Sequence, residues 1–203
     1  MATADELWLG VFQRLCDATA HQFKGALNGV AVNLEVVRSR STKADADTST
    51  VRPFAEAAAA ELESVIQSAE AMLSLARSPR GGGATDIAKI TRDVAVLASR
   101  GAAASEAGTR LTVDKGVERL GTTSVPASAA RLAIAAVLMA AVEVSDDVVC
   151  AAVEGPGGPA MRISYAERDG SRFALSDEVV SAAHSAGVHL DIFESGATIT
   201  FPT

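Results

Sequence analysis

An apolar stripe in the first forty residues constrains the fold more than any other feature of the chain. Apolar side chains recur at spacings of three and four residues from Leu9 to Val37, which is the period of one face of an α-helix. A helix of this length exceeds most helices of globular domains and is typical of a helical bundle. The stripe consists of Leu9, Phe12, Cys16, Ala20, Phe23, Leu27, Val30, Leu34 and Val37.

A polar segment, residues 39–50, separates this helix from a second apolar stripe. The segment has no apolar anchor, so we expect a turn there. The second stripe runs at helical spacing from Phe54 to Ala76, and Pro53 suits the first turn of its helix. Two long helices joined by a short turn form an antiparallel hairpin, which cannot bury both stripes alone. We therefore expect two copies to pair into a four-helix bundle, that is, a homodimer.

Residues 78–83, Ser-Pro-Arg-Gly-Gly-Gly, predict a joint between two domains, because proline and three consecutive glycines disfavour a helix. The predicted domains are residues 1–80 and 84–203. In the second, Thr85-Asp86 predicts a helix N-cap, and Ala127 to Val144 predicts a mostly buried helix. Strands are expected at 110–114, 148–153, 160–166, 189–193 and 197–201, and a further helix at 175–186, closed by Gly187. This order predicts an α+β sandwich.

The composition argues against several classes of protein. The chain of 203 residues has a net charge of −7, which disfavours nucleic-acid binding through a broad basic surface. Cys16 and Cys150 are expected to be buried reduced thiols, and no Cys/His cluster predicts a metal site. There is no signal-peptide pattern, and the longest apolar stretch, Leu132 to Val144, is too short to span a bilayer. We therefore expect a cytoplasmic protein without a membrane partner.

One histidine lies on the first predicted helix with polar neighbours at helical spacing. His21 follows the stripe residue Ala20 by one position, about 100° round the helix, and so lies on the flank of the seam. Lys24 and Asn28 follow one and two turns later. The segment resembles the H-box of sensor histidine kinases, in which the histidine carries a phosphoryl group. The matching residues are His21, Phe23, Lys24, Leu27 and Asn28.

The second half of the chain resembles the ATP-binding domain of histidine kinases, of the GHKL ATPase family. The stretches 86–113, 131–141 (the family's N-box helix) and 182–202 carry this resemblance, which implies a fold. Of the adenine-reading box only Asp169-Gly170 remains, and Gly155 to Pro159 predicts a hairpin turn rather than a phosphate loop. We expect a degenerate GHKL-like domain that binds no ATP. Alanines stand where the family's magnesium-holding asparagine would be: Ala135, Ala136, Ala140 and Ala141.

The H-box itself departs from the family at two positions. Gln22 replaces the acid that, by the resemblance, serves as general base in the attack on ATP, and an amide cannot take that proton. Gly25 replaces the residue used to dephosphorylate a partner. Phosphotransfer demands less, because a receiver domain carrying an aspartyl phosphate supplies its own Mg²⁺. The resemblance thus implies a histidine phosphotransferase in which His21 is the phosphoacceptor, supported by Lys24, Asn28 and Gln22.

Two functions of different classes stay open. The first is a dimeric histidine phosphotransferase of a two-component phosphorelay, which passes phosphoryl groups between receiver aspartates and binds no cofactor itself. The second is a non-catalytic pseudokinase that binds a receiver domain as a scaffold. A true kinase with an unusual nucleotide site is a third, less favoured reading. His184 and His189 are expected to be structural, and Asp146-Asp147 to mark a helix-to-strand turn.

Overall fold

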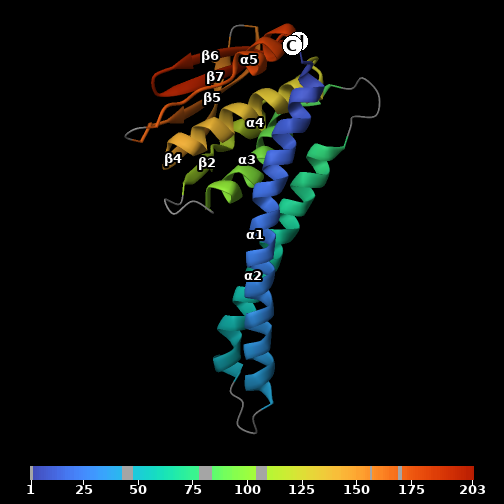
Figure 1. Cartoon of the computed structure of the whole chain (residues 1–203), viewed down its shortest axis with the longest axis vertical. Helices are drawn as coiled ribbons and strands as arrows, with labels where there is room; N and C mark the ends of the chain where they lie inside the picture. The colour runs from blue at the N-terminus through green and yellow to red at the C-terminus, as the bar shows by residue number, and fades with distance from the viewer. Residues whose placement is uncertain (1, 43–47, 78–83, 104–108, 156, 169–170) are drawn as a thin grey trace.

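The computed structural model is a mixed α+β structure with an N-terminal helical region and a C-terminal part that contains a sheet (Figure 1). The structure describes residues 2–42, 48–77, 84–103, 109–155, 157–168 and 171–203. The N-terminal region consists of α1 (Ala4–Ser41) and α2 (Thr48–Ala76), which run side by side and project beyond the sheet. Residues 78–83, the predicted joint, lie outside the described residues.

A complete N-cap starts α1. The Thr3 hydroxyl accepts a hydrogen bond from the Glu6 backbone N–H (3.3 Å), and the Glu6 carboxylate accepts one from the Thr3 N–H (2.8 Å). Arg38 and Arg40 lie in the last turn, where positive charge stabilises the helix dipole. As a result α1 runs unbroken for 38 residues and enters the segment predicted as a turn. Of that segment, 39–41 and 48–50 are helical, and 43–47 lie outside the described residues.

The prediction that Pro53 lies in the first turn of its helix was wrong, because α2 begins five residues earlier, at Thr48. Contacts across this end of the hairpin hold the extra turn. The Arg40 guanidinium donates to the Thr50 carbonyl oxygen (2.9 Å) and lies 4.7 Å from the centroid of the Phe54 ring. The Arg52–Glu56 ion pair (2.7 Å) spans the proline on the helix surface. Because Pro53 lies beyond the first turn, it removes one backbone donor from α2, and these contacts keep the helix continuous around it.

The predicted stripe of α1 is not the face that packs against the rest of the chain. Leu9, Leu27 and Leu34 of the stripe are 56%, 48% and 52% exposed. The buried face lies ~90° further round the helix and packs into the core with α2 and the helices of the C-terminal part. The buried residues of α1 are Trp8, Val11, Leu15 and Thr19.

The C-terminal part is a five-stranded mixed sheet with helices on one face (Figure 1). The strand order is β2-β4-β5-β7-β6, with β2 parallel to β4 and the other neighbours antiparallel. The helices α3 (Ile87–Ala103), α4 (Ala127–Val144) and α5 (Asp177–Ser185) accompany it. The strands are β2 (Arg110–Val113), β4 (Asp147–Gly155), β5 (Gly158–Tyr165), β6 (His189–Phe193) and β7 (Gly196–Thr200).

Most of the predicted elements in this part are confirmed within a few residues. Asp86 accepts a hydrogen bond from the Lys89 N–H (2.9 Å) and so caps α3 as expected. Gly155 pairs with Gly158 across the β4–β5 hairpin, and Gly157 adopts φ 93°, which confirms the predicted turn. The sequence analysis missed a short pair of strands, β1 (Thr85–Asp86) and β3 (Thr122–Thr123), and the 3₁₀ helix η1 (Lys115–Arg119).

The helix α4 is the centre of the core. It contacts α3, α5 and α1, and in Figure 1 it lies between the sheet and α1. Its alanine-rich surface lets these neighbours approach closely, and residues such as Leu132, Ile134 and Leu138 are completely buried. Among the described residues α4 alone is long and apolar enough to cross a membrane, and 67% of it is buried inside the structure.

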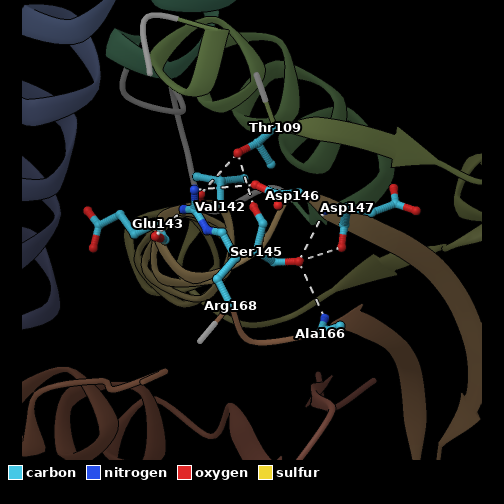
Figure 2. Close-up of polar contacts among 8 residues, drawn as sticks. All are labelled: Thr109, Val142, Glu143, Ser145, Asp146, Asp147, Ala166 and Arg168. Carbon is cyan, nitrogen blue, oxygen red and sulfur yellow. Dashed lines mark hydrogen bonds and ion pairs between the residues drawn. The ribbon is translucent and has the colours of Figure 1, made fainter. Parts of the chain in front are cut away.

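A guanidinium holds the C-terminal end of α4 (Figure 2). The Arg168 side chain donates to the Glu143 carbonyl oxygen (2.7 Å), and the Arg168 backbone N–H donates to the Val144 carbonyl oxygen (2.7 Å). Nη1 of Arg168 also lies 3.3 Å from a carboxylate oxygen of Asp146. Positive charge at this position meets the negative end of the helix dipole.

Two hydroxyl groups complete this end of the helix (Figure 2). Thr109 Oγ1 donates to the carbonyl oxygen of Ser145 (3.0 Å). Ser145 Oγ in turn accepts hydrogen bonds from the N–H groups of Asp147 (3.2 Å) and Ala166 (3.3 Å). Asp146 and Asp147 therefore belong to a helix-to-strand turn, as the sequence predicted.

Replacing Arg168 by alanine is expected to lower the free energy of unfolding by about 1–2 kcal/mol, because two charge-assisted contacts at the helix end are lost. Urea denaturation followed by circular dichroism measures the change. Arg172→Ala is the matched control, since Arg172 is exposed and makes no ion pair within the described residues. Equal losses for the two variants would contradict the role of Arg168.

The two thiols differ in burial. Cys150 is buried as predicted, whereas Cys16 is only half-buried because it lies on the uncovered stripe of α1. Burial raises the pKa of Cys150 to about 12, and burial, followed by the charge of Glu167, raises the pKa of Tyr165 to about 12. Both groups therefore resist ionisation in the folded chain.

Stability is expected to fall as the pH rises from about 9 towards 12. Below that window both groups are protonated in the folded and unfolded chain; above pH 9 the unfolded chain ionises first. Urea denaturation at a series of pH values tests this expectation. In Cys150→Ala the free energy of unfolding should fall less steeply with pH than in the wild type. An unchanged fall would show that the thiol does not contribute to it.

Candidate functional site

The predicted phosphoacceptor lies on an exposed face of the continuous helix α1. His21, Lys24 and Asn28 are all exposed, and their spacing of three and four residues places them on one side of the helix. The structure thus brings these three predicted site residues together. The helical backbone fixes the positions of these residues along the helix axis, about one turn apart.

Gln22 lies away from this group. It is half-buried, and its spacing from Leu15 and Thr19 places it on the face of α1 that packs into the structure. Its Oε1 is buried and has no hydrogen-bond partner among the described residues. The amide therefore sits beside His21 in sequence but on a different side of the helix.

Gly25 leaves open space one turn after His21. It is exposed, and a Cβ atom added there would meet nothing within 4 Å. Packing within the chain therefore does not explain why glycine, a residue that destabilises helices, stands at position 25. Gly29, one turn further, differs: an added Cβ would overlap the carboxylate of Glu61, which lies against α1 from α2. Close approach of the two helices accounts for Gly29 but not for Gly25.

Gly25→Ala is expected to raise the free energy of unfolding by about 0.5–1 kcal/mol, because alanine favours the helix and its methyl group meets no atom. Thermal and urea denaturation measure the gain. Gly29→Ala is the matched comparison on the same helix, and its gain should be smaller because the Glu61 carboxylate must move. A loss of stability in Gly25→Ala would contradict the open space.

Sequence analysis missed one residue of the His21 face. Asp17 stands four residues before His21 and is exposed on the same side of α1. The spacing of four residues between Asp17 and His21 is visible in the sequence, but the H-box pattern has its acidic residue directly after the histidine. Asp17 and Lys24 thus flank His21 with opposite charges.

The predicted N-box positions lie on α4 and are largely packed into the core. Ala135 and Ala141 are completely buried, Ala136 is 8% exposed and Ala140 is half-buried. These methyl groups contribute to packing and present no oxygen to a metal. Asp169-Gly170, the predicted remnant of the adenine box, lies outside the described residues.

A set of polar contacts joins the C-terminal end of α2 to α3 and α4. The Arg131 guanidinium on α4 donates to the Arg77 carbonyl oxygen (2.9 Å), and burial lowers the pKa of Arg131, opposed by the charge of Asp93. Lys89 on α3 donates to the Ser74 hydroxyl and pairs with Asp93 (2.7 Å). These contacts hold the helical hairpin against the C-terminal part.

The other two histidines belong to the C-terminal part. His184 on α5 and His189 on β6 are exposed, with ring centroids 5.6 Å apart. They lie in the helix and strand expected for them and do not pack into the core. Within the described part of the chain, no group of three or more His, Cys, Asp or Glu side chains could hold a metal ion.

Comparison with known proteins finds distant structural neighbours among the solved structures. No protein-family model and no curated protein matches the chain. Among solved structures, the chain is similar to full-length ShkA, a hybrid histidine kinase, in complex with AMPPNP. The TM-score is 0.38 at 19% identity over 93% of this chain. The chain spans 45% of the length of that ShkA chain, so the similarity to a two-component protein is weak and partial.

Proposed function

We propose that this chain is a histidine phosphotransfer protein of a two-component phosphorelay. It passes phosphoryl groups between receiver-domain aspartates through His21 and binds no ATP. The observation that carries this proposal is the exposed face of α1, where His21, Lys24 and Asn28 lie together beside the open space at Gly25. A cytoplasmic location and receiver-domain partners are part of the proposal.

The reaction needs little from this chain. A neutral imidazole nitrogen of His21 attacks the phosphorus of an aspartyl phosphate in line with the leaving oxygen. The N–P bond forms as the P–O bond breaks, and the receiver's aspartate leaves as a carboxylate. Lys24 offsets the negative charge of the phosphoryl group, and Asn28 donates a hydrogen bond to it. Mg²⁺ belongs to the receiver domain.

Gly25 supports this assignment on steric grounds. A receiver must bring its aspartyl phosphate to within bonding distance of a nitrogen that projects from a straight helix. A side chain one turn from His21 would stand in that approach, and Gly25 has none. Gln22, turned inward, supports the site only through the packing of α1 against the rest of the chain.

His21→Ala is expected to abolish phosphorylation of the chain by an aspartyl-phosphorylated receiver domain, because no other nucleophile replaces the imidazole. Transfer of radiolabel, stable to base and labile to acid, measures the reaction. His184→Ala is the matched control, since His184 is exposed on the C-terminal part, and it should take up label like the wild type. Label retained by His21→Ala would refute the assignment of His21.

A non-catalytic scaffold is the second candidate. Gln22 in place of an acid and the buried N-box alanines favour it, because both remove groups that kinase chemistry uses. The same labelling experiment separates the two functions. A receiver that binds the chain without transferring label would favour the scaffold.

We also propose that the chain is a homodimer through its helical hairpin. Large apolar side chains stay exposed along both helices of a single chain, and such patches in soluble proteins mark interfaces. On α1, Leu9, Leu27 and Leu34 share one face of the helix, whereas Val32 lies on another side. On α2, Leu62, Ile66 and Leu73 recur at spacings of four and seven residues, which suits a four-helix bundle formed by two hairpins. The exposed apolar residues of the hairpin are Leu9, Leu27, Val32, Leu34, Leu62, Ile66 and Leu73.

Leu62→Glu is expected to shift the dimer to monomer, because a carboxylate would be buried in the proposed bundle. Analytical ultracentrifugation measures the dissociation constant, which should rise by at least about tenfold. Ile192→Glu is the control, since Ile192 is 47% exposed on β6, far from the hairpin in the chain. A wild-type chain that sediments as a monomer at micromolar concentration would contradict the dimer.

A further inference from the structure

Asp17 and His21 form an unassigned pair on the exposed face of α1. A spacing of four residues puts their Cβ atoms about 5–6 Å apart, within reach of a side-chain hydrogen bond. Both side chains are exposed, and neither makes a hydrogen bond or ion pair with any residue that the structure describes. Arg14, also exposed and one turn nearer the N-terminus, makes no ion pair with Asp17. The Asp17 carboxylate is thus available to the imidazole.

Helix geometry puts Asp17 within reach of the His21 ring. Cα–Cβ bonds in a helix tilt towards its N-terminus, so a side chain can reach the turn before its own Cα. Asp17 stands in the turn before His21, and His21 stands in the turn before Lys24.

We propose that Asp17 is a positioning residue for phosphoryl transfer at His21, an inference that rests on the proposed phosphotransfer function. Its carboxylate accepts a hydrogen bond from Nδ1–H of the imidazole and so selects the tautomer with the lone pair on Nε2. Nε2 is then the atom that attacks phosphorus. The carboxylate supplies, from the turn before the histidine, an orienting group that Gln22 does not provide.

The step balances without a proton acceptor. Nε2 bonds to phosphorus while the P–O bond to the receiver's aspartate breaks and its electron pair leaves with the aspartate. The proton on Nδ1 stays there, so the phosphorylated ring carries a positive charge that Asp17 offsets. Water weakens the pair in the free chain, and a docked receiver that excludes water strengthens it. The effect of Asp17 should therefore be larger on transfer than on folding.

The test compares Asp17→Asn and Asp17→Glu with Glu63→Gln in the full chain. Glu63 is exposed on α2 without a hydrogen bond or ion pair among the described residues, so its variant removes the same charge elsewhere. Initial rates of label transfer from an aspartyl-phosphorylated receiver are measured, together with the ¹⁵N chemical shifts of the His21 ring at alkaline pH. Circular dichroism and ultracentrifugation check that fold and association state are kept.

Asp17→Asn is expected to slow transfer about fivefold and to shift the ring towards the Nε2–H tautomer. Asp17→Glu should restore part of the rate, and Glu63→Gln should match the wild type. Wild-type rate and tautomer in Asp17→Asn would overturn the inference while phosphotransfer through His21 stands. A wild-type chain that takes no label would overturn the proposed function, and the ring spectra would then decide the Asp17–His21 hydrogen bond alone.

Discussion

The structure depends on the burial of α4. Its alanine-rich surface lets the sheet, α3, α5 and the N-terminal half of α1 all approach one helix, so the two parts of the chain share a core. Apolar burial of this kind is the main source of folding free energy, and close packing makes it sensitive to shape. The polar groups at both ends of α4, Arg131 at the start and Arg168 at the end, satisfy carbonyl oxygens that the packing leaves near the surface.

The use of α4 as a packing element also bears on chemistry. At the positions where α4 faces its neighbours it presents apolar side chains rather than polar groups. Ala135 and Ala141, two of the predicted N-box positions, are completely buried. The packed surface of α4 and the exposed face of α1 that carries His21 are thus separated in space.

The sequence predicted the positions of the helices and strands well, but it predicted less well which face of a helix is buried. Hydrophobic spacing located α4 to the residue, and glycines located the β4–β5 turn and the end of α5, because these signals are local. The face of α1 that is buried in the chain was not predicted, because the Trp8 face and the Leu27 face are both apolar at helical spacing. Only the position of α4 decides between them. At the site, His21, Lys24 and Asn28 follow from spacing, whereas the inward turn of Gln22 depends on tertiary packing.

The unbroken length of α1 has a mechanical consequence. The helix is about 57 Å long, and its buried residues, Trp8, Val11, Leu15 and Thr19, all lie in its N-terminal half. A tilt of one degree about Thr19 would move the far end of the helix, ~33 Å away, by about 0.6 Å. His21 lies only ~3 Å beyond Thr19 along the helix and would move by less than about 0.1 Å. Small repacking around Trp8 would thus be felt mainly at the C-terminal end of α1, without any joint in between.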